Sequence, residues 1–298
     1  MLTRRKILYN LIDMLDNATP IRIQKSMFVC YIEFGKSFPY SFFPNKMGCY
    51  SINLHDDYHI LANKGYLIRN DQNKYMVNKK EKDLFVLPKA IMLKISDVAK
   101  KCNNLTDESL IQYTYEKKPY YAYRSTLLNL MENNSESFKE TFDKIKNSIE
   151  SKSSRIYTIG YEGQNLDYLL AKLLYMNVKT LVDVRKNAFS MRREFSKTSL
   201  EHGCNEAGIR YIHCPEVGIE SEKRQELLPD GKRKELFDWY EKAILPNRLE
   251  FINKMSDLFK DGSICFLCYE KNPHDCHRLH LANFCLNSNS SFNSVENI

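Results

Sequence analysis

Three consecutive residues near the end of the chain, Cys276, His277 and Arg278, bring together a thiol, a titratable imidazole and a permanent cation. The apolar run at 263–268 before them predicts a buried strand, and apolar residues at helical spacing after them predict a helix. In open α/β sheets the carboxyl ends of strands bind ligands, and a helix amino end attracts anions and lowers a thiol pKa. This turn is therefore the first candidate for a functional site.

Two interpretations of the turn are open. In the functional one, Cys276 is a nucleophile with a lowered pKa, Arg278 binds an anion, and His277 holds the loop or transfers a proton. In the structural one, the turn is a capped helix start with a structural cysteine and a surface arginine. Because three adjacent side chains cannot all point one way, at least one of them is expected to be structural.

Other polar residues follow further strands in the same half of the chain. Segments 156–160, 180–184 and 210–213 predict strands, and parallel strands place their carboxyl ends on one sheet edge. We expect one cleft there, in which a carboxylate acts as a base or holds a ribose hydroxyl and paired arginines clamp a phosphate. The candidate catalytic residues are Asp183, Glu270, Cys276 and His277. The candidate binding residues are Tyr161, Glu162, Arg185, Ser190, Arg192, His213 and Arg278. For Asp183 and Arg185, the structural alternative is a mutual ion pair that braces the sheet edge.

The cysteines and histidines at 265–280 superficially offer zinc ligands. Cys265 and Cys268, however, lie three positions apart on the expected strand, so their side chains point to opposite faces and Cys265 belongs to the core. We therefore predict no metal site. The sequence has neither the phosphate-binding loop of nucleoside triphosphatases nor the glycine fingerprint of dinucleotide enzymes, and we expect no cofactor.

The order of expected elements divides the chain. Strands alternate with helices at 154–286, which predicts a Rossmann-like α/β domain with a mainly parallel sheet. Residues 1–82 predict three helices and then a hairpin, the order of a winged-helix-like α+β domain. Residues 83–153 are expected to be a helical connector and linker, and the Ser- and Asn-rich residues 287–298 a disordered tail.

Charge distinguishes the two halves. Residues 1–150 hold 23 Lys and Arg against 17 Asp and Glu, so they carry most of the net charge of +7. A basic half suggests a polyanion partner, most simply nucleic acid and, for a winged helix, DNA. An ordinary lysine-rich surface is the alternative. The expected nucleic-acid contacts gather around the hairpin at Lys64, Arg69, Lys74, Lys79 and Lys80.

Length and composition limit the expected number of domains and the expected location of the protein. A chain of 298 residues suits one large or two ordinary domains. No run of about 18 apolar residues occurs, so we expect no membrane association. The amino-terminal segment lacks the pattern of a signal peptide. The nine cysteines are an odd number without disulfide spacing, which favours reduced thiols and a cytoplasmic location.

Four separated motifs carry a resemblance: YTIGYEG at 157–163, LVDVR at 181–185, RYIH at 210–213, and CYE with CHR at 268–278. Together they resemble the bacterial family named domain of unknown function 488, over about residues 155–286. The first half also resembles the helix-turn-helix-type extension of some members, through FPNKMGCY at 43–50 and NKGY at 63–66. The resemblance implies a Rossmann-like fold and a link to nucleic-acid metabolism and phage defence, without a reaction. The family often has Pro and then Ser-Arg after its DVR motif, which Ser190 and Arg192 match loosely.

Two classes of function fit these observations. The first is an enzyme that acts on a nucleic acid or nucleotide, with the basic first domain delivering the substrate. The second is a non-catalytic regulator that binds DNA and senses a small anionic ligand in the α/β pocket. A cleft with convergent Asp, Glu and Cys favours the enzyme, whereas a pocket of arginines and backbone donors alone favours the sensor.

Overall fold

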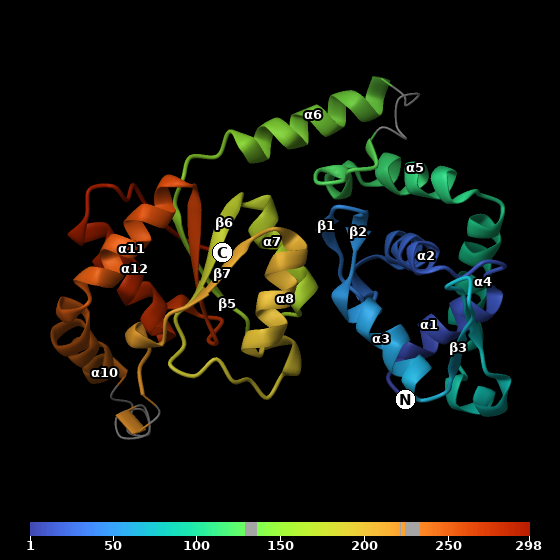
Figure 1. Cartoon of the computed structure of the whole chain (residues 1–298), viewed down its shortest axis with the longest axis horizontal. Helices are drawn as coiled ribbons and strands as arrows, with labels where there is room; N and C mark the ends of the chain where they lie inside the picture. Colours follow the sequence, from blue (N-terminus) through green and yellow to red (C-terminus); the bar gives the residue numbers. More distant parts are fainter. Residues whose placement is uncertain (129–135, 221, 224–232) are drawn as a thin grey trace. The chain divides into compact units, whose positions relative to one another are not determined.

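The computed structural model describes residues 1–128, 136–220, 222–223 and 233–298. The chain divides into two compact units, Met1–Asn147 and Ser148–Ile298, and each is considered by itself. Both are coloured along the sequence in Figure 1.

The second unit is built on a five-stranded sheet in the order β7-β6-β8-β5-β9. Every strand pair in it is parallel. The strands are β5 (Ile156–Gly160), β6 (Val178–Asp183), β7 (Arg210–His213), β8 (Ser263–Cys268) and β9 (Val295–Asn297). All residues of β5 and β8 are buried, as expected for strands covered on both faces. The predicted Rossmann-like α/β fold class is confirmed for this unit.

Helices cover both faces of this sheet (Figure 1). Helices α7 (Leu166–Tyr175) and α8 (Lys197–Ala207) lie together on one face, and α10 (Arg233–Trp239), α11 (Leu249–Lys260) and α12 (His277–Ser288) lie on the other. Asn165 starts α7 by accepting a hydrogen bond from the Tyr168 backbone N–H, and Ser196 starts α8 in the same way. A five-residue π-helical segment, Tyr240–Ile244, follows α10.

The end of the chain differs from the sequence-based expectation. Residues 295–297, expected in a disordered tail, form β9 along the edge of β5. Phe292 anchors this segment, because it is only 4% exposed and its ring lies 5.2 Å from that of Phe259. The prediction failed because an anchor and a three-residue polar strand are too short to stand out against the Ser- and Asn-rich composition around them.

The first unit contains the expected helices α1 (Thr3–Met14), α2 (Pro20–Phe34) and α3 (Ile52–Asn63), followed by the expected hairpin of β3 (Leu67–Arg69) and β4 (Tyr75–Val77). It also has a second hairpin between α2 and α3, made of β1 (Phe43–Asn45) and β2 (Gly48–Tyr50). A helix-helix-helix-wing order does not include that hairpin. The winged-helix assignment therefore stays a prediction.

Helices α4 (Lys89–Asn103) and α5 (Asp107–Lys117) belong to the first unit. Ile95, Val98 and Cys102 of α4 are buried in the same apolar core as α1 and α2. The buried guanidinium of Arg22 reinforces this packing by donating to the carbonyl of Cys102 and to Asp107. Residues 83–117 are thus part of a folded unit rather than a connector, and α6 (Glu136–Glu150) spans the boundary between the units. Among the described residues, no helix is both long and apolar enough to cross a bilayer.

Candidate functional site

The carboxyl ends of β5, β6, β7 and β8 bring several of the predicted residues to one edge of the sheet. A pocket of about 870 Å³ opens there. Of the predicted site residues, Tyr161, Arg185 and His213 line it. Its described lining is Tyr161, Arg185, Lys186, Asn187, Ala188, Phe189, Ser196, Lys197, Thr198, His213, Ile219, Cys268 and Tyr269.

Asp183 and Arg185 form a buried ion pair at the floor of this edge. Arg185 Nε lies 2.8 Å from Asp183 Oδ1, and Arg185 Nη2 lies 2.5 Å from Asp183 Oδ2. Tyr211 also donates to Asp183, at 2.8 Å, while the remaining guanidinium nitrogen, Nη1, donates to the Tyr161 hydroxyl at 3.0 Å. Burial alone would lower the pKa of Arg185, but the hydrogen bonds and charge of Asp183 raise it above its ordinary value. The Asp183 carboxylate is therefore held by Arg185 and Tyr211, and the structural alternative considered for this pair agrees with the geometry.

Close backbone approaches fix the loops around the pocket. A Cβ on Gly160 would lie 1.8 Å from the carbonyl oxygen of Glu270, and a Cβ on Gly218 would lie 2.2 Å from the backbone nitrogen of Lys186. His213, the last residue of β7, contacts the loop after β6, because its Nε2 lies 2.9 Å from the carbonyl oxygen of Arg185. Glycine is thus required at both positions for the loops to reach the sheet edge.

Arg278 does not lie in the pocket, contrary to the prediction that it clamps an anion. It is 1% exposed, so the alternative of a surface arginine is also wrong. Its Nη1 donates to the carbonyl oxygen of Glu270 at 2.6 Å and its Nη2 to that of Lys271 at 3.2 Å. The guanidinium therefore holds the loop between β8 and α12, a role that its place in the sequence could not distinguish from ligand binding.

Cys276 is likewise closed off from solvent, with 1% of its surface exposed. Burial raises the pKa of its thiol well above the ordinary value, and the neighbouring Cys268 raises it further. The prediction of a low-pKa nucleophile at this position is wrong for this structure, because the first turn of α12 packs into the core instead of facing the pocket. A thiol in such surroundings is protonated and poorly reactive.

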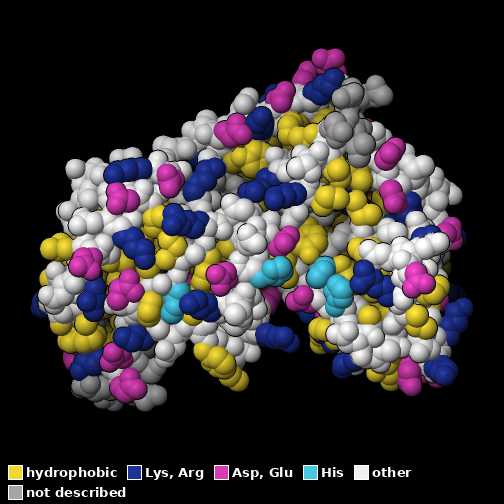
Figure 2. All heavy atoms as spheres, viewed as in Figure 1, with side chains coloured by type: hydrophobic (Ala, Val, Ile, Leu, Met, Phe, Trp, Pro, Cys, Tyr) yellow, Lys and Arg dark blue, Asp and Glu magenta, His cyan; other side chains and the backbone are white. Residues whose placement is uncertain are grey.

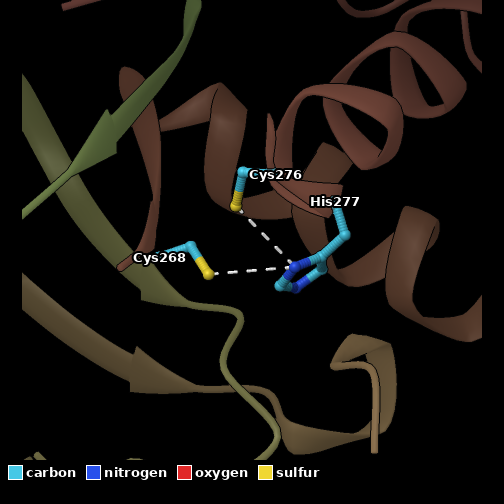
Figure 3. A group of neighbouring side chains, drawn as sticks. All are labelled: Cys268, Cys276 and His277. Atoms are coloured by element: carbon cyan, nitrogen blue, oxygen red, sulfur yellow. Dashed lines mark hydrogen bonds between the residues drawn. The ribbon is translucent and has the colours of Figure 1, made fainter. Parts of the chain in front are cut away.

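Cys276 does have chemically notable neighbours. The side chains of Cys268, Cys276 and His277 point toward one another from the end of β8 and the start of α12 (Figure 3). Nδ1 of His277 lies 3.8 Å from each sulfur. Glu270 Oε2 accepts a hydrogen bond from Cys268 at 3.2 Å. The predicted residues Glu270, Cys276 and His277 are thus brought together, but behind the pocket.

Three other predicted residues lie outside the pocket lining. Glu162 accepts from the backbone N–H of Lys271 at 2.9 Å and lines a separate surface depression with Glu270. Arg192 pairs with Glu194, and the Ser190 hydroxyl accepts from the Arg192 backbone N–H at 3.2 Å. Both arrangements stabilise loop segments.

Comparison with known proteins identifies this unit. Residues 165–285 match the model of a family described as domain of unknown function DUF488. The second unit is a DUF488 domain. No curated protein and no solved structure matches the chain. The resemblance drawn from the sequence motifs is thereby confirmed over residues 165–285, which contain three of the four motifs.

Several pocket residues of the DUF488 domain were not predicted from the sequence. They share positions in the β6–α8 segment or directly after β8, and they are Lys186, Asn187, Phe189, Ser196, Lys197, Thr198 and Tyr269. Two signals could have found them. Phe189 is a large apolar residue in a polar loop, and the Ser-Lys-Thr-Ser run at 196–199 starts a helix just after a strand-end loop.

The predicted nucleic-acid residues of the first unit surround the β3–β4 hairpin. Lys64, Arg69, Lys79 and Lys80 are exposed, and Lys74 is half-buried. Arg69 donates to Asn73 within the hairpin turn at 2.7 Å. On the face drawn in Figure 2, Lys and Arg side chains are interspersed with acidic and uncharged ones. DNA binding by these residues stays a prediction.

Proposed function

We propose that the protein is a DNA-binding regulator whose DUF488 domain binds a nucleotide or a related phosphate-bearing ligand without converting it. The observation that carries the proposal is the composition of the pocket. Its described lining combines cations, hydroxyls and exposed aromatic rings, and includes no Asp or Glu. Such a set suits recognition of an anion attached to a flat, unsaturated ring system.

The cationic part of the pocket suits phosphate. Lys197 and Lys186, whose ammonium also pairs with Glu220 at 3.0 Å, line it together with His213. Ser196 and Thr198 add hydroxyl donors at the start of α8, an eleven-residue helix whose amino end faces this region. Lysine ammonium groups and a helix amino end are both favourable partners for a phosphate group.

The aromatic part suits a base. Phe189 is 76% exposed and Tyr269 is 46% exposed, although both border the pocket. Large apolar side chains left in solvent beside a cationic pocket are typical of surfaces on which bases stack, and such stacking contributes about 1–3 kcal/mol per base.

Binding without turnover is favoured over catalysis because the candidate catalytic groups are engaged elsewhere. Asp183 is neutralised by Arg185, and Cys276 is buried with a raised pKa. Neither side chain belongs to the pocket lining. A general acid or base must reach the substrate within hydrogen-bond distance, directly or through one water.

The test is a calorimetric titration of the full chain with a panel of nucleoside mono-, di- and triphosphates and with inorganic phosphate. For the ligand that binds, Lys197→Glu and Phe189→Ala are expected to weaken binding at least about tenfold, equivalent to about 1.4 kcal/mol. The matched control is Lys179→Glu, which makes the same charge change on an exposed residue at the opposite end of β6.

Two outcomes would contradict the proposal. One is an equal loss of affinity in Lys179→Glu, which would show that net charge and not the pocket determines binding. The other is chemical conversion of the ligand, detected by mass spectrometry after incubation, which would support the enzyme instead.

A further inference from the structure

The cluster of Cys268, Cys276 and His277 has the dimensions of a metal site. The three potential ligand atoms all lie within 4.8 Å of one another. Nδ1 of His277 lies 3.8 Å from both sulfurs. Tetrahedral zinc, with Zn–S near 2.3 Å and Zn–N near 2.0–2.1 Å, places neighbouring ligand atoms about 3.5–3.8 Å apart. The cluster therefore needs little movement to enclose an ion.

The imidazole of His277 is held in the orientation that coordination requires. Its Nε2 lies 3.0 Å from the carbonyl oxygen of Val184. A carbonyl oxygen only accepts hydrogen bonds, so Nε2 carries a proton, and Nδ1 is the ring nitrogen that faces the two sulfurs. The ring of Tyr240 packs edge-on at 5.6 Å and restrains the imidazole further. A metal-binding histidine characteristically has its second nitrogen bound to such an outer partner.

A fourth ligand is available next to the cluster. Oε2 of Glu270 lies 3.2 Å from the sulfur of Cys268, and Glu270 follows β8 by two residues. Glu270 is not among the three residues whose ligand atoms all lie within 4.8 Å of one another, so its carboxylate would have to move toward the cluster to complete a tetrahedral set of two thiolates, one imidazole and one carboxylate. The adjacent guanidinium of Arg278, which donates to the Glu270 carbonyl, places a buried cation beside this excess of anionic groups.

We propose that Cys268, Cys276, His277 and Glu270 bind one structural zinc ion that ties the loop 269–275 to the start of α12. Thiolate and imidazole together favour zinc over the hard ions Mg²⁺ and Ca²⁺, and an iron–sulfur cluster ordinarily needs four cysteines. All three cluster residues are buried, which suits a closed structural site and not a catalytic one with an open position. Cys268 also lines the pocket, but the zinc proposal does not depend on which ligand the pocket binds.

The site differs from the zinc arrangement considered from the sequence. Cys265 is buried in β8, three residues before Cys268, and is not part of the cluster. His280 contacts Glu241 instead, with 2.6 Å between Nδ1 and Oε1. The sequence-based prediction of no metal site considered Cys265 and Cys268 as a ligand pair. In the structure, Cys268 lies instead beside Cys276 and His277 at the start of α12.

The experiment is metal analysis of the full chain, expressed in zinc-supplemented medium and purified without chelator. We expect about one zinc ion per folded chain by plasma mass spectrometry. Cys276→Ser and His277→Ala are expected to lose most of this zinc. Cys265→Ser is the matched control, because it alters a buried cysteine of the same strand outside the cluster, and it should keep the metal.

If the cluster variants do not fold, a second measurement on the wild-type protein tests metal binding by the cluster. Wild-type protein, stripped by a chelator and titrated with Co²⁺, should show sulfur-to-cobalt charge-transfer absorption and the intense visible bands of tetrahedral cobalt, saturating at about one ion per chain. Glu270→Gln should keep the charge-transfer band while changing the visible bands.

Some results would overturn the proposal. Wild-type protein that carries no zinc and gives no cobalt charge-transfer band would do so. A Cys268–Cys276 disulfide found by mass spectrometry in protein prepared under reducing conditions would also do so, since it would make the pair a redox couple.

Discussion

At the scale of single residues, the ion pair of Asp183 and Arg185 is expected to have a large effect on stability. Their side chains are 0% and 6% exposed, respectively. Asp183→Asn leaves the guanidinium without its counter-charge, and breaking a buried pair from one side costs about 3–5 kcal/mol. Urea denaturation monitored by circular dichroism should show a clearly lower midpoint. Asp257→Asn, which removes the partner of an exposed ion pair with Lys260, should leave the midpoint unchanged, and equal midpoints for both variants would contradict the argument.

The sequence predicted the residues near the site better than their roles. Strand ends could be located from apolar runs, so Asp183, Arg185 and His213 were placed at the correct edge of the sheet. The direction of a side chain after a strand depends on how the next helix packs, and that information is not local. Arg278 and Cys276 were therefore assigned to a ligand, although the first turn of α12 directs both into the interior.

At the scale of elements, the approach of β5 to the loop after β8 depends on Gly160. Because a methyl group there would collide with the backbone carbonyl of Glu270 at 1.8 Å, Gly160→Ala should force the loop away and lower the free energy of unfolding by several kcal/mol. Gly163→Ala is the control. Its φ of 74° carries the strain of a left-handed residue, about 1–2 kcal/mol, but its Cβ meets nothing within 4 Å. The melting temperature of Gly160→Ala should be clearly lower than that of Gly163→Ala. Equal decreases in the two variants would contradict the expected collision at Gly160.

Strand β9 provides a second test at this scale. Deleting residues 289–298 removes the edge strand β9, one of the two strands that pair with β5, and the buried ring of Phe292. Burial of one such ring contributes about 1.5–3 kcal/mol, so the truncated protein should melt at a distinctly lower temperature. Ser290→Ala, at an exposed position of the same segment, should melt like the wild type. An unchanged melting temperature after the deletion would restore the expectation of a disordered tail.

Most longer elements were predictable, and short ones were not. Strands with continuous apolar runs, such as β5 and β8, were located within a few residues. The β1–β2 hairpin was missed because its strands have three residues each and include Pro44, so no alternation could develop. Helices α4 and α5 were recognised as helices, but their membership in the first unit depends on long-range packing.

At the scale of the whole molecule, the regulator proposal requires DNA binding by the first unit. The full chain should shift duplex DNA at low salt, and the logarithm of affinity should fall linearly with the logarithm of salt concentration. Lys80→Ala should reduce the magnitude of this slope by about 0.9 if the ammonium contacts a phosphate. Lys100→Ala, at an exposed position of α4 and outside the hairpin segment, should leave the slope unchanged. Failure of the full chain to shift DNA at any salt concentration would end the DNA-binding half of the proposal.

The position of β8 has a consequence for how the second unit folds. In the sheet, β8 lies between β5 and β6, although it follows both by many residues in the chain. Contacts between residues so distant in sequence require a large loop to close, which slows folding. Until β8 inserts, β5 and β6 have no common partner, and each exposes unpaired backbone groups that invite pairing with other chains. Insertion of this single strand should therefore limit the folding rate, and chaperones should matter most in the interval before it occurs.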